Sequence, residues 1–69
     1  MAEDSDLHLT TRELEILRLI AAGRTNGEIA ELLVVELSTV KWHVKNLYSK
    51  LAARDRVQLV LRAQALQLG

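Results

Sequence analysis

Two places in this sequence carry a threonine followed three residues later by a glutamate, each just ahead of an apolar run. Thr10 with Glu13, and Thr25 with Glu28, match the capping box, in which the two side chains cap each other's backbone N–H groups at a helix start. Gly23 stands where a left-handed residue often ends a helix. The first two helices are therefore predicted to begin at these threonines.

A third helix is predicted over residues 38–51, and a fourth from Asp55, its candidate N-cap, to about Gln67. At about 100° per residue, the apolar residues of the third helix share one core-facing stripe. These are Val40, Val44, Leu47 and Leu51. The segment LLVVEL favours a strand on propensity, but a lone strand would have no pairing partner in so short a chain. It is interpreted as a helix end and a tight turn, so the predicted fold is an all-α bundle of four helices.

The composition supports a small helical domain and removes several alternatives. The 69 residues make one domain, 49% of them hydrophobic, with no proline and no cysteine. Neither disulfides nor a cysteine-based zinc site can therefore stabilise it. No apolar run approaches the roughly 20 residues of a membrane span, and no signal peptide is visible. The sequence predicts a soluble, cytoplasmic protein with a disordered acidic tail at residues 1–6 and a folded domain at residues 7–69.

The formal net charge is zero, but it is unevenly distributed along the chain. Residues 1–36 hold eight acidic residues and three arginines, whereas residues 37–69 hold six basic residues and one aspartate. Such a division predicts a basic surface on one side of the domain, and a basic surface suits phosphate. The alternative at this point is an ordinary solvated helix face.

A short helix, a turn and a longer helix with a polar outer face are typical of a helix-turn-helix, here predicted at about residues 25–44. In this motif the second helix enters the major groove of DNA and reads base edges. The predicted outer face of that helix carries Ser38, Lys41, Trp42, Lys45, Asn46 and Ser49. Lysines can donate to guanine or hold phosphates, and an apolar ring can pack on a thymine methyl. The lysines could instead merely solubilise the helix; the exposed tryptophan between them favours a partner.

Three segments also resemble one known family: LTTRELEILRLIAAGRTNGEIAELL, TVKWHVKNLYSKL and RDRVQLVLRA. They are similar to the LuxR-type (GerE-like) DNA-binding domain of bacterial transcription regulators over residues 7–66. The TVKWHVKNLYSKL version of the motif, together with the closing RAQALQL, looks most like the C-terminal domain of the large MalT-type ATP-dependent regulators, ahead of response regulators of the NarL type. The resemblance implies a C-terminal four-helix domain that binds double-stranded promoter DNA as a homodimer. Control would come from an N-terminal regulatory region that this sequence does not contain.

Carried over residue by residue, the resemblance implies three groups of site residues. Bases would be read by Lys41, Trp42 and Lys45. The DNA backbone would be contacted by Thr25, Asn26, Ser38 and Thr39, to which the helix face itself adds Asn46 and Lys50. A dimer interface would involve Val57, Gln58 and Leu61; the fourth helix independently carries more apolar surface than one packing face requires. Whether this surplus is core or partner surface is open from sequence alone.

Three residues depart from the family pattern. Glu36 stands where the recognition helix usually has a serine or threonine N-cap, and glutamate caps poorly. Ala52 stands where glycine usually ends that helix, so the helix is expected to run longer or to end differently. Ala53 replaces a larger apolar residue and should lose some packing.

Other functions fit the sequence less well. The histidines, His8 and His43, have no metal or catalytic-triad spacing, and no glycine-rich phosphate loop is present, so no catalytic residue, metal site or cofactor is predicted. The serious alternative is a helix-turn-helix that binds protein without binding DNA. Salt dependence separates the two, because displaced counterions make DNA binding fall steeply with salt.

Overall fold

A computed structural model describes residues 9–66, which form four helices. They are α1 (Thr11–Ala21), α2 (Asn26–Leu33), α3 (Leu37–Lys50) and α4 (Arg56–Ala65). These described residues contain no strand, so the predicted all-α fold is confirmed and LLVVEL is indeed a helix end and a turn. The predicted tail at residues 1–6 lies outside the described residues. No helix among residues 9–66 is long and apolar enough to cross a membrane.

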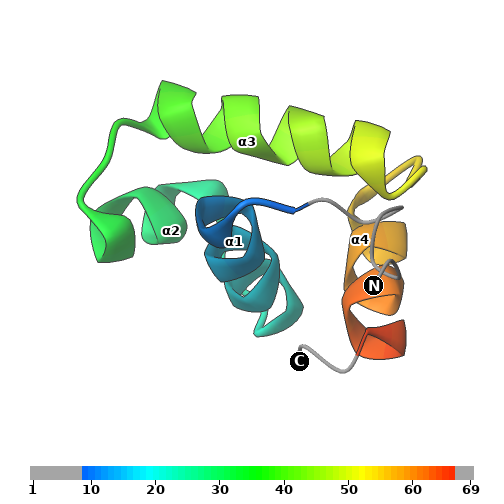
Figure 1. The fold of residues 1–69 in the computed structure, drawn as a ribbon. Helices are drawn as coiled ribbons and strands as arrows, with labels where there is room; N and C mark the ends of the chain where they lie inside the picture. Colours follow the sequence, from blue (N-terminus) through cyan, green and yellow to red (C-terminus); the bar gives the residue numbers. More distant parts are fainter. Residues whose placement is uncertain (1–8, 67–69) are drawn as a thin grey trace.

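The helix α1 is the centre of the fold. It packs against α4, α3 and α2, and α2 packs in turn against α3. In Figure 1, α3 runs along one side of the molecule, with α1, α2 and α4 on the other. One face of α3 therefore meets the core while its opposite face is left without a neighbouring helix.

All four helices contribute to a single apolar core. The buried side chains are Ile16, Leu17, Ile20, Ile29, Ala30, Val40, Val44, Leu47, Leu51, Leu59 and Ala63. The predicted stripe of α3 is part of this core, as are Leu59 and Ala63 of α4. Ala53 is half-buried and packs against the same cluster despite its small size.

The helix starts follow the predicted caps. In both capping boxes the threonine Oγ1 accepts from the glutamate backbone N–H at 3.1 Å, and the glutamate Oε1 accepts from the threonine N–H at 2.9 Å. Asp55 caps α4 by accepting from the Gln58 N–H at 2.9 Å. Glu36 occupies the N-cap of α3 without any side-chain cap hydrogen bond, as expected of a long acidic side chain at that position.

Three helices end with a residue in the left-handed region, but only one of these residues is glycine. Gly23 has φ 90°, Val34 has φ 57° and Ala52 has φ 54°. At each end, paired backbone hydrogen bonds close the last turn, such as Val35 N–H to the Ala30 carbonyl at 3.0 Å. This is the pattern of the Schellman motif.

The prediction for the end of α3 was wrong. The absence of glycine at Ala52 does not prolong α3, which ends at Lys50, because Ala53 N–H bonds the Tyr48 carbonyl at 3.0 Å and holds Ala52 in the left-handed conformation. The fourth helix ends at Ala65, with Leu66 as its C-cap, near the predicted end at about Gln67, which itself lies outside the described residues.

Candidate nucleic-acid interface

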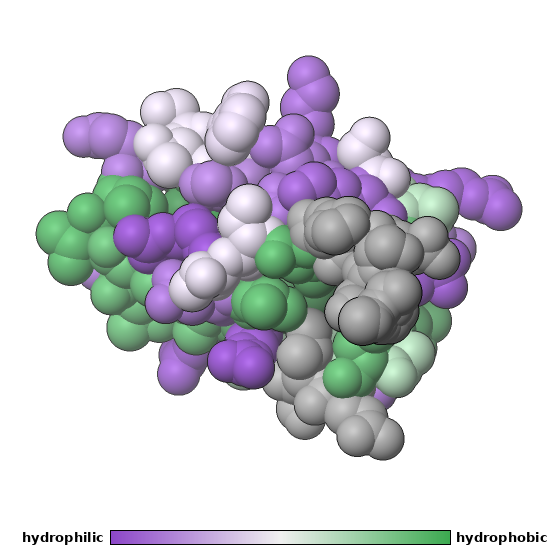
Figure 2. Space-filling view, in the orientation of Figure 1, coloured by the Kyte–Doolittle hydropathy of each residue, from purple (hydrophilic) through white to green (hydrophobic). Residues whose placement is uncertain are grey.

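The outer face of α3 carries the three predicted base-reading side chains. Lys41, Trp42 and Lys45 are all exposed, and 60% of the Trp42 surface is accessible. Residues 37–50 include three lysines and no acidic residue. Figure 2 shows a mainly polar surface along this side of the molecule. Sequence periodicity therefore assigned the core and solvent faces of α3 correctly, because a regular helix fixes both at once.

Trp42 is exposed but not without contacts. Its ring meets the ring of the adjacent His43 edge-to-face, with centroids 5.0 Å apart and an interplanar angle of 69°. The His43 side chain is half-buried, and its Nδ1 is buried without a hydrogen-bond partner among the described residues. An apolar ring in contact with its neighbour therefore lies between two exposed cations, Lys41 and Lys45.

The remaining predicted backbone contacts lie at two helix starts and on the flank of α3. Ser38 is exposed in the first turn of α3, whereas Thr39 and Asn46 are half-buried. Thr25 is the exposed N-cap of α2, where its Oγ1 accepts from Glu28 N–H and keeps its own hydroxyl hydrogen for donation. These positions add neutral donors, which suit phosphate oxygens, around the lysines.

Asn26 is oriented by a residue that the sequence analysis did not identify. The Arg56 guanidinium donates from Nη1 to Asn26 Oδ1 and from Nη2 to the Arg24 carbonyl, both at 2.9 Å. Because the amide oxygen is occupied in this way, the amide NH₂ is the group left for an outside acceptor. The link joins the start of α4 to the start of α2, and no local pattern predicts a contact between residues 30 positions apart.

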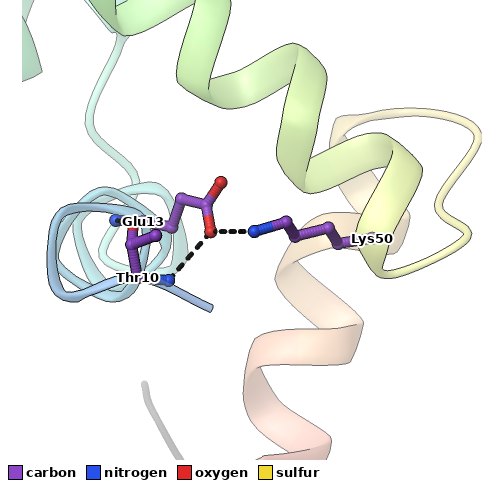
Figure 3. Close-up of polar contacts among 3 residues, drawn as sticks. All are labelled: Thr10, Glu13 and Lys50. Atoms are coloured by element: carbon purple, nitrogen blue, oxygen red, sulfur yellow. Dashed lines mark hydrogen bonds and ion pairs between the residues drawn. The ribbon is translucent and has the colours of Figure 1, made fainter. Parts of the chain in front are cut away.

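Lys50 makes a contact within the domain that the sequence did not predict. Its Nζ donates to Oε1 of the buried Glu13 at 2.8 Å, and the same oxygen accepts from the Thr10 N–H (Figure 3). Burial raises the pKa of the Glu13 carboxyl, but the hydrogen bonds from Lys50 and Thr10 and the electrostatic interactions with Lys50 and His43 outweigh it and hold the pKa below 4.5. Lys50 thus ties α3 to α1.

The predicted interface residues of α4 divide into two kinds. Val57 and Leu61 are exposed, so the surplus apolar surface of this helix is not core. Gln58 is half-buried, and its Oε1 accepts from the Arg54 N–H at 2.8 Å, which stabilises the helix start. Arg62 Nε donates to the Leu51 carbonyl at 3.0 Å. Only the two apolar side chains are therefore available to a neighbour without breaking a contact.

Together α2, the turn at residues 34–36 and α3 form a helix-turn-helix whose second helix presents a basic outer face. The family model described as GerE, bacterial regulatory proteins of the luxR family, matches residues 7–63. The chain is 54% identical over 55 residues to the transcriptional regulatory protein LiaR of Bacillus subtilis, and 53% identical over 55 residues to the response regulator protein VraR of Staphylococcus aureus. Each match covers 80% of this chain and 26% of the relative.

The chain belongs to the LuxR family of bacterial regulatory proteins, and it is a DNA-binding helix-turn-helix domain of a transcription regulator. It spans about a quarter of the length of these curated relatives. None of the relatives named above is a MalT-type regulator, and VraR is named a response regulator. A MalT-type parent therefore stays a prediction without support from them.

Proposed function

We propose that this domain binds double-stranded promoter DNA sequence-specifically, with α3 in the major groove. The observation that carries the proposal is the outer face of α3. It is free of acidic residues, and it presents Lys41, Trp42 and Lys45 away from the core. A helix of 14 residues is about 21 Å long, enough to lie in the groove with its first turns against the bases.

The proposed contacts divide by chemistry. Lys41 and Lys45 donate to guanine edges, and Trp42 packs on a thymine methyl or a sugar edge. Neutral donors hold the phosphates and fix the register: Thr25, Asn26, Ser38, Thr39 and Asn46. Lys50 already donates to Glu13, so in this proposal it contributes less to backbone contact than the neutral donors do.

We further propose that the domain acts as a homodimer on DNA, as the C-terminal part of a longer cytoplasmic regulator with an N-terminal regulatory region. Exposed Val57 and Leu61 on α4 support pairing through that helix, and the 26% coverage of the relatives supports a longer parent. A two-fold pair would read two half-sites about one DNA turn apart. The proposal gives the domain no catalytic role.

The first test compares Lys45→Ala with Arg18→Ala, which removes the same charge from the exposed end of α1. Duplexes selected from a random pool provide the specific site, and fluorescence anisotropy measures binding across salt concentrations. Lys45→Ala should weaken binding to the selected site about tenfold or more and random duplex much less, because a base contact carries about 1–3 kcal/mol of discrimination.

Arg18→Ala should leave the preference for the selected site unchanged. For the unaltered chain, log K should fall linearly with log salt, since bound lysines release counterions. An unaltered chain that binds no duplex at low salt would remove the proposed function, and equal losses on both duplexes for Lys45→Ala would remove its base-reading role.

A further inference from the structure

The turn between α2 and α3 carries an exposed apolar surface that adjoins the start of the basic face of α3. Its accessible fractions are 56% for Leu32, 88% for Val34 and 42% for Leu37. The intervening Leu33 and Val35 are half-buried and pack on the core, so the core does not need the outward three. Figure 2 shows an apolar area at this end of the molecule. We call Glu31, Leu32, Val34, Glu36 and Leu37 the turn surface.

The two carboxylates of the turn surface differ from the other acidic side chains of residues 9–66. Glu13 pairs with Lys50, and Glu15 with Arg12 at 3.3 Å. Glu28 and Asp55 cap helix starts. Within that range only the carboxylates of Glu31 and Glu36 make no hydrogen bond or ion pair, and both residues are exposed. Negative charge without an ion-pair partner among residues 9–66 therefore flanks the apolar side chains.

The turn surface also costs the domain stability in three ways. Val34 adopts a left-handed φ of 57°, which is unfavourable for a β-branched residue. Glu36 holds an N-cap position without capping it. Three large apolar groups remain in water. Residues that lower the stability of a fold are concentrated at functional sites. Here three such features fall within a few residues.

We propose that the turn surface is a docking site for a basic amphipathic helix of another protein. Leu32, Val34 and Leu37 would receive apolar side chains spaced one helical turn apart, as in other helix-in-groove or helix-on-patch contacts. Glu31 and Glu36 would pair with flanking lysines or arginines of that helix. DNA is not the occupant, because two unpaired carboxylates repel phosphate.

The position of the turn surface favours a separate molecule over a neighbouring segment of this chain. Glu13, near the start of α1, contacts Lys50 at the end of α3. The turn lies at the other end of α3, about 20 Å away. In Figure 1, α4 lies at the opposite end of the molecule from the turn. A partner on the turn surface thus leaves both ends of the described chain accessible.

The test selects randomised helical peptides, displayed on phage, for binding to the 69-residue chain. Peptides that also bind the Val34→Gly variant are removed. Glycine suits the left-handed conformation, so this variant keeps its fold while losing the most exposed apolar side chain. Selected peptides should carry two apolar residues three or four positions apart with lysine or arginine beside them. In ¹⁵N-resolved NMR spectra they should shift the amides of residues 31–37.

Matched variants then separate the apolar and the charged contributions to peptide binding. Leu32→Ser should weaken peptide binding at least tenfold, whereas Leu61→Ser, at a leucine of similar exposure (54%), should not change it. Replacing Glu31 and Glu36 together by glutamine should weaken binding several-fold and remove its salt dependence. DNA affinity should be the same for Val34→Gly and the unaltered chain. No enriched peptide, an acidic consensus, or amide shifts centred on α4 would each overturn the proposal.

Discussion

Val34 and Ala52 adopt a backbone conformation that is unfavourable for their side chains. Both end helices in the left-handed region, where a side chain meets the following carbonyl oxygen at a cost of roughly 1–2 kcal/mol. Each is nevertheless held by hydrogen bonds to the preceding turn. These backbone hydrogen bonds at the helix ends therefore hold conformations that the two residues do not favour.

Val34→Gly should raise the free energy of unfolding by about 1 kcal/mol, since relief of left-handed strain exceeds the extra entropy of glycine in the unfolded chain. Urea unfolding followed by circular dichroism measures the change. Ala52→Gly is the companion variant and should also stabilise, by a smaller amount because alanine is not β-branched. A lower midpoint for Val34→Gly would mean that the valine side chain stabilises the free domain.

At the scale of elements, two polar links hold helices in register: Lys50 to Glu13 between α3 and α1, and Arg56 to Asn26 between α4 and α2. Apolar packing between helices tolerates some sliding, whereas a hydrogen bond fixes two particular residues. Both links lie at helix ends, so they set the angles at which α2 and α3 are presented.

The Glu13 link should make stability depend on pH. Its pKa is lower in the folded chain than the ordinary 4.5, so the folded state binds this proton less readily than the unfolded state. Its contribution is complete above pH 4.5 and is lost as the pH falls below 4.5 through the folded pKa. Urea unfolding between about pH 6 and about pH 3 should show a steeper loss for the unaltered chain than for Glu13→Gln.

At neutral pH, Glu13→Gln should itself lower the free energy of unfolding by about 2 kcal/mol, because charge-assisted hydrogen bonds are replaced by neutral ones. Glu15→Gln, at an exposed pair on the same helix, is the control and should cost well under 1 kcal/mol. Parallel pH profiles for Glu13→Gln and the unaltered chain would contradict the assignment.

Arg56→Ala should affect both folding and DNA binding. Loss of two hydrogen bonds should lower the free energy of unfolding by about 1–2 kcal/mol. It should also free the Asn26 amide to rotate and weaken duplex binding several-fold without changing the salt slope, since the lost phosphate donor is neutral. Arg54→Ala, an exposed arginine two residues earlier, is the comparison. A salt slope reduced by about one unit would show that Arg56 itself touches phosphate.

At the scale of the whole molecule, exposed side chains with different chemistry occupy different places: lysines and tryptophan on α3, apolar residues on α4, and apolar residues with carboxylates on the turn surface. The acidic first half and the basic second half of the sequence correspond in part to these separate surfaces. The net charge of zero does not reveal this uneven distribution.

Leu61→Glu tests the pairing of two domains. Because Leu61 lies outside the core, the variant should stay folded, with an unchanged circular dichroism spectrum. It should lose cooperative binding to a duplex with two half-sites while keeping its affinity for one half-site, as gel-shift titrations would show. Unfolding would mean that Leu61 supports the core, and unaltered cooperativity would exclude this part of α4 from the interface.

Sequence alone determined what depends on near neighbours in the chain. Both capping boxes, the Asp55 cap and the core stripe of α3 follow from spacings of three and four residues, which a helix turns into contacts. The exposure of Lys41, Trp42 and Lys45 followed from the same periodicity.

The tertiary structure decided what depends on residues far apart in the sequence. Lys50 gains its hydrogen bond to Glu13 only when α3 meets α1, and Arg56 gains its hydrogen bond to Asn26 only when α4 meets the start of α2. Local rules cannot anticipate such outcomes, since the competing interactions come from elements that only the folded chain brings together.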